Sequence, residues 1–177
     1  MPEYLTTAFA VSPQHLGIGW FWFLPLSFIV HDGEEAIYIW MKGALKNDIS
    51  SRSLSPAQAM IAMAYELAII VVVTIWAARP HASSLAIFSY AVLLSLWIAH
   101  GFLHLGLQYR AGRRYSMGIV TVVPVVLLGG IYIYALLLQT GMLTWGWALA
   151  SLFIGILLIL PFIRSARQVA LAFRSLQ

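Results

Sequence analysis

The sequence predicts an all-α integral membrane protein, a bundle of five transmembrane helices that forms a single domain over residues 1–177. Of the 177 residues, 62% are hydrophobic and 9% are charged, whereas a soluble domain has about 45–50% and about 25%. The mean hydropathy is +0.88, and the apolar segments are each close to the length of about 20 residues that crosses a bilayer. The chain has no cysteine, which excludes disulfides, cysteine-based zinc sites and cysteine nucleophiles.

The expected spans follow one another with short polar connections. They run from Leu16 to Met41, Pro56 to Ala78, Ala82 to Leu107, Tyr115 to Leu138 and Met142 to Ile163. The first contains Asp32, Glu34 and Glu35, which is too polar for a secretory signal, so we expect it to be retained. The second is expected to begin with a capping box, because Ser55 is followed by a proline and, three residues on, by Gln58.

Basic residues predict the orientation of the bundle. Nine of the ten Lys and Arg residues follow the first, third or fifth span, and only Arg79 follows the second. By the positive-inside rule this places the N-terminus outside and the C-terminus in the cytoplasm, and we expect the cytoplasmic (inner) membrane of a bacterium. The net charge of +4 is assigned to contacts with lipid headgroups, so the bilayer is the expected partner and nucleic acid is not.

Ionisable side chains fall inside three of the expected spans, where each charge costs about 2.5–3.5 kcal/mol near the bilayer centre. At 1.5 Å of rise per residue, they lie about 9–16 Å inward from the cytoplasmic edge, in one layer. The spacing also stacks them, at i, i+3 and i+4 on the first helix and at i and i+4 on the third. One shared site is therefore predicted in the cytoplasmic half, built from His31, Glu34, Glu35, Glu66, His100 and His104.

Imidazole and carboxylate groups on facing helices are typical ligands of zinc and iron. We expect one or two divalent ions, zinc or iron, bound by His31, Glu34, Glu66, His100 and His104, with Glu35 as the general base. Asp32 is expected to orient a histidine or to face water, and Tyr38 and Gln108 to contact the substrate. The predicted function is a membrane metalloenzyme that acts on a hydrophobic or lipid-like small molecule through metal-activated water or dioxygen.

The segment His31-Asp32-Gly33-Glu34-Glu35 resembles the motif of the HXXEE family of small integral membrane proteins. The length and helical character of the chain are similar to that family throughout. The resemblance implies a candidate membrane enzyme without an assigned reaction, and it carries functional weight only to His31, Glu34 and Glu35.

Three other interpretations of the buried polar residues stay open. A metal-free isomerase or cyclase could use a glutamic acid and a histidine for proton transfer. A proton or metal-ion transporter could use the same residues as a relay, although the outer halves of the helices offer no ionisable group to continue it. A hydrogen-bond cluster that only fixes helix packing is the structural alternative.

Overall fold

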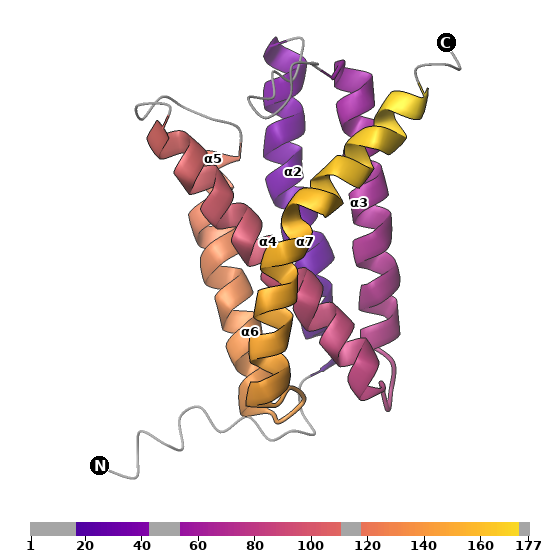
Figure 1. Cartoon of the computed structure of the whole chain (residues 1–177), viewed down its shortest axis with the longest axis vertical. Coiled ribbons are helices and arrows are strands. Elements are labelled where there is room, and N and C mark those ends of the chain that lie inside the picture. Colours follow the sequence, from indigo (N-terminus) through magenta and orange to yellow (C-terminus); the bar gives the residue numbers. More distant parts are fainter. Residues whose placement is uncertain (1–16, 43–53, 111–117, 174–177) are drawn as a thin grey trace.

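The computed structural model describes residues 17–42, 54–110 and 118–173, and most of these residues are helical (Figure 1). The all-α class is therefore confirmed for this part of the chain. In order, the elements are the 3-10 turn η2 (Ile18–Trp22), α2 (Phe23–Lys42), α3 (Pro56–Ala77), α4 (Ser84–Arg110), α5 (Ile119–Thr121), the π-helical η3 (Val122–Gly129), α6 (Gly130–Gln139) and α7 (Trp145–Ala172).

Four helical rods are long and apolar enough to cross a membrane, which suggests an integral membrane protein. They are α3, α4, the continuous rod Ile119–Gln139 formed by α5, η3 and α6, and α7. Helix α2 is 20 residues long but carries Asp32, Glu34 and Glu35, which keep it out of this set. The expected number of five spans therefore depends on how α2 buries its three acids.

Successive helices run in opposite directions, so the ends of α2, α4 and α7 lie at one end of the bundle (Figure 1). Arg110 is the last residue of α4, and Arg164 and Arg167 lie in the final part of α7. Arg79 lies at the opposite end, between α3 and α4. Most of the described basic residues thus lie at one end of the bundle, as their positions in the sequence predicted.

The predicted start of α3 is confirmed in atomic detail. Ser55 Oγ accepts a hydrogen bond from the backbone N–H of Gln58 at 3.2 Å, and the Gln58 side chain accepts one from the Ser55 N–H at 3.0 Å. This is the capping box, which satisfies two of the N–H groups that lack partners at a helix start. The expected starts of the first and fourth spans, Leu16 and Tyr115, lie outside the described residues.

The last helix extends beyond the membrane span expected for it. That span ends at Ile163, where the apolar run meets Arg164, whereas α7 continues to Ala172. Ala166 and Ala170 are buried while Arg164 is exposed. The extension is therefore an amphipathic helix that packs through small residues, and a search for apolar length alone does not detect it.

Helix α4 is the most buried of the four apolar rods and lies at the centre of the bundle. Its Tyr90 is fully buried and donates a hydrogen bond to the carbonyl of Phe21 at 3.0 Å. Helix α7 packs directly on it, because a Cβ atom on Gly155 would lie 2.7 Å from the backbone nitrogen of Leu96. Helix α7 also bends in Figure 1 and contains Pro161, which cannot donate the backbone hydrogen bond of a straight helix.

Candidate metal centre

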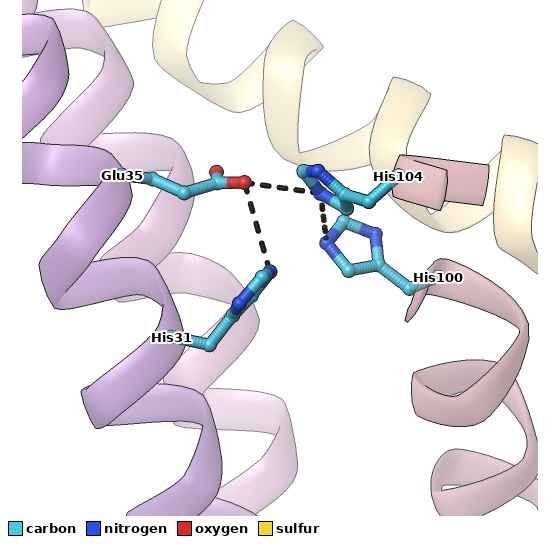
Figure 2. Close-up of side chains that lie close together, drawn as sticks. All are labelled: His31, Glu35, His100 and His104. Atoms are coloured by element: carbon cyan, nitrogen blue, oxygen red, sulfur yellow. Dashed lines mark hydrogen bonds and ion pairs between the residues drawn. The ribbon is translucent and has the colours of Figure 1, made fainter. Parts of the chain in front are cut away.

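Four side chains from α2 and α4 point toward one another (Figure 2). His31 and Glu35 lie one turn apart on α2, and His100 and His104 lie one turn apart on α4. Each residue offers one ligand atom, and these four atoms all lie within 4.8 Å of one another. We call these four residues the His3Glu group.

The spacing within the His3Glu group fits a single small ion. Nε2 of His104 lies 2.9 Å from Nε2 of His100 and 3.0 Å from Oε1 of Glu35. The same Oε1 lies 3.7 Å from Nε2 of His31. Ligand atoms placed about 2.0–2.1 Å from zinc in a tetrahedron are about 3.4 Å from each other. The three separations in the structure fall on both sides of that value.

Thr121, at the end of α5, determines which nitrogen of His31 faces the group. Its hydroxyl donates to Glu34 Oε2 at 2.8 Å and therefore accepts from Nδ1–H of His31, also at 2.8 Å. With the proton of the neutral ring on Nδ1, Nε2 presents a lone pair. This lone pair faces the carboxylate oxygen of Glu35, which is an acceptor as well.

The two facing acceptors are buried without a hydrogen bond. Neither Nε2 of His31 nor Oε1 of Glu35 has a hydrogen-bond partner, and the contact of Oε1 with His104 is close enough for an ion pair but lacks hydrogen-bond geometry. His31 is fully buried and Glu35 is 9% exposed. A buried acceptor without a partner destabilises a fold, and a cation between these two atoms is one way to satisfy both.

The structure does not bring Glu34 into the His3Glu group, although the spacing predicted it as a ligand. Its carboxylate accepts from the backbone N–H groups of Val120 and Thr121, at 3.2 and 3.0 Å. These N–H groups begin a helix and have no partner within it, and the helix dipole favours an anion there. Glu35, predicted as the general base, takes the place among the ligand atoms instead.

Gly118 brings its backbone against the group from the side of α5. Its φ is +71°, a region that favours glycine, and a Cβ there would overlap Cε1 of His31 and lie 3.0 Å from both Nε2 of His31 and Oε1 of Glu35. Sequence analysis missed Gly118 and Thr121. Neither lies on the helices that carry the polar pattern, and their sequence neighbourhood gives no signal of contact with α2.

Glu66 and Asp32 lie outside the His3Glu group. Glu66, predicted as a ligand from its depth on α3, lines a small cavity together with His100. Asp32 is buried at 8% exposure, so it does not face water, and it is close enough to Glu35 and Glu66 for their charges to interact. Depth along a helix placed Glu66 in the same layer as the group, but depth alone does not show that its carboxyl lies in the adjoining cavity and not among the ligand atoms.

The two predicted substrate contacts are half-buried near the group. Tyr38 lies on α2, one turn beyond Glu34, and Gln108 lies on α4, one turn beyond His104. Oε1 of Gln108 is buried without a hydrogen-bond partner. Neither residue contributes an atom to the His3Glu group.

Aromatic rings close the group on the side away from Glu35. Trp97 stacks on His100 with 5.3 Å between ring centroids and 5° between ring planes. It also meets His31 edge-on at 5.3 Å, and Phe28 packs against it at 5.2 Å. Such a wall excludes water and strengthens electrostatic interactions inside the site.

Comparison with known proteins gives one match. A sequence model of a family described as "Protein of unknown function with HXXEE motif" matches residues 22–133. The matched range holds the three motif residues and extends through α4, α5 and η3 into α6, so it also includes His100, His104, Gly118 and Thr121. No curated protein and no solved structure matches the chain significantly.

Proposed function

This chain belongs to the HXXEE family of proteins of unknown function, and we propose that it is an integral membrane metalloenzyme with a divalent ion at the His3Glu group. The observation that carries the proposal is the pair of buried acceptors, Nε2 of His31 and Oε1 of Glu35, that face each other without a hydrogen bond. A cation between them would satisfy both lone pairs and neutralise the carboxylate.

The donor set suits zinc or iron. Three neutral imidazoles and one carboxylate are borderline ligands, which zinc and iron(II) accept and which magnesium and calcium do not prefer. Four atoms within 4.8 Å of one another accommodate one ion. With Glu34 and Glu66 outside the group, a single ion is favoured over the pair of ions that the sequence left open.

Thr121 and Glu34 support the proposed centre from outside. A histidine that binds a metal commonly donates its second ring N–H to an acceptor, which orients the ring. Thr121 accepts that bond from His31, and the Glu34 carboxylate fixes the direction of the Thr121 hydroxyl. The second glutamate of the motif thus has a positioning role.

The surroundings favour an apolar substrate. The wall formed by Trp97 and Phe28 excludes water and gives the group an apolar side. A metal ion that accepts a fifth ligand beside these four protein atoms would activate water or dioxygen for reaction with a hydrophobic or lipid-like molecule. Glu35 would then act as a ligand and not as the base.

We further propose that α2 is the fifth membrane span. Its acids face inward, since Glu35 lies in the His3Glu group, Glu34 caps α5 and Asp32 is buried. The exposed side of α2 is apolar, with Leu26, Ile29, Val30, Ile37 and Trp40 each more than half exposed. With cations at the end where α2, α4 and α7 finish, that end is cytoplasmic, and the membrane is the inner membrane of a bacterium.

Elemental analysis of purified protein, expressed without a histidine tag, tests the proposal. We expect zinc or iron at one ion per chain in the wild type and its loss in the His100→Ala/His104→Ala variant. His81→Asn is the matched control, because His81 is exposed at the opposite end and has φ of +60°, which asparagine tolerates. Metal retained in the double variant would refute the ligand assignment, and metal absent from both proteins would favour the acid-base isomerase.

A further inference from the structure

A small cavity adjoins the His3Glu group between α2, α3, α4 and α7. Its lining is apolar except for the Glu66 carboxyl, the His100 ring and the Trp97 indole. His100 is part of both the cavity lining and the His3Glu group, because its ring lines the cavity and its Nε2 lies 2.9 Å from Nε2 of His104. A molecule in the cavity would therefore lie beside the proposed metal centre.

Two polar side chains in this lining have no hydrogen-bond partner among the residues that the structure describes. The Trp97 side chain is buried at 3% exposure, and its Nε1–H has no hydrogen-bond partner. Glu66 makes no hydrogen bond within the described part of the chain. A buried donor without a partner is rare and costs stability. One residue with a free donor and one with acceptor oxygens thus line the same apolar space.

A hydroxyl group satisfies both of them at once. It accepts from the indole N–H through an oxygen lone pair and donates its own hydrogen to the Glu66 carboxylate. The cavity has room for a group about the size of one water molecule, which a hydroxyl matches. The half-buried residues of its lining include Leu93, Phe162 and Ile163, so the rest of the molecule would lie against hydrocarbon.

We propose that the cavity binds the hydroxyl group of an apolar alcohol, with Trp97 as donor and Glu66 as acceptor. The proposal deepens the proposed function by naming the substrate class, and it rests on that function for the chemistry that follows binding. The apolar body of the alcohol lies along Phe162 and Ile163, next to Pro161, where α7 bends. The hydroxyl is held beside His100.

Photocrosslinking in lipid nanodiscs tests the binding. The probe is a primary ten-carbon alcohol with a diazirine on its chain, and labelled peptides are identified by mass spectrometry. We expect labelling of the α7 peptide that contains Phe162 and Ile163. Unlabelled 1-decanol competes with the probe, methyl decyl ether competes about tenfold less well because it lacks the hydroxyl hydrogen, and decane does not compete.

Variants assign the two hydrogen bonds. Trp97→Phe keeps a ring but removes the N–H, and Glu66→Met keeps a side chain of similar length but removes both acceptor oxygens, so each should weaken 1-decanol binding about tenfold. Trp147→Phe is the control, because Trp147 is 47% exposed at the other end of the bundle. If Trp97→Phe does not fold, the comparison of the three competitors on the wild type still tests whether the cavity binds a hydroxyl group.

Two results would overturn the inference: equal competition by decane and 1-decanol, or unchanged competition in both variants. Either result would indicate that the cavity holds a water molecule and does not bind an alcohol hydroxyl. The His104→Ala variant separates this inference from the metal proposal, because His104 does not line the cavity. Alcohol binding that persists there without metal supports the cavity alone, and metal without alcohol binding supports the metal centre alone.

Discussion

Gly118 and Gly141 form a matched pair that tests how tightly the α5 side closes on the metal centre. Their φ values are +71° and +69°, so an alanine at either position costs a similar amount of backbone strain, about 1–2 kcal/mol. A Cβ on Gly141 would meet open space. A Cβ on Gly118 would overlap the His31 ring, which would have to move by about 1 Å to reach van der Waals separation.

A movement of that size exceeds the tolerance of about 0.2 Å for metal–ligand distances. We therefore expect Gly118→Ala to weaken metal binding at least as much as the loss of an orienting partner, about 10–100-fold. Gly141→Ala should lower the thermal unfolding midpoint, because it introduces a similar backbone strain, but it should not change the metal affinity. Competition with a chromophoric chelator measures the affinity of both variants. Equal affinity in the two variants would show that the His31 ring is not held against Gly118.

The remaining predictions concern positioning, linkage and packing. Thr121→Val should lower metal affinity about 10–100-fold in the same chelator assay, and Thr121→Ser, which keeps the hydroxyl, should restore it; equal affinities would exclude the orienting role. Free metal at 100 times its Kd should stabilise the wild type by about 2.7 kcal/mol in unfolding experiments and should not stabilise His104→Ala. Gly155→Ala should destabilise the fold by about 1–3 kcal/mol because α7 would be pushed from the α4 backbone. Gly146→Ala, in open space on the same helix, should be neutral or stabilising, and the same outcome for Gly155 would contradict the close packing.

Features that depend on the local sequence were predictable. The all-helical class follows from apolar runs of bilayer length, and the start of α3 follows from hydrogen bonds between Ser55 and Gln58, three residues apart. The end of α7 was not predictable from hydropathy, because beyond Arg164 it is held by buried alanines. Small residues that pack closely contribute little to a hydropathy average, so such an average does not reveal them.

The site was predictable on each helix and not between helices. Periodicity placed His31 and Glu35 on one face of α2 and His100 with His104 on one face of α4, and these faces meet. Depth alone could not tell that Glu66 lies outside the group, in the lining of the adjoining cavity, because depth carries no information on rotation about the helix axis. Thr121 and Gly118 contact His31, which lies about 90 positions earlier in the sequence. These contacts depend on the packing of α5 against α2.

The helical geometry of the motif explains why two adjacent glutamates have different roles. Relative to His31, position i+3 lies about 60° to one side of the helix and position i+4 about 40° to the other. Glu34 therefore turns toward the start of α5, and Glu35 turns toward the histidines of α4. His31 lies between them and uses both ring nitrogens, Nδ1 toward Thr121 and Nε2 toward Glu35. A single turn of α2 thus joins the proposed ligand set to the hydrogen bonds that orient it, and moving either carboxylate by one position would disconnect the two.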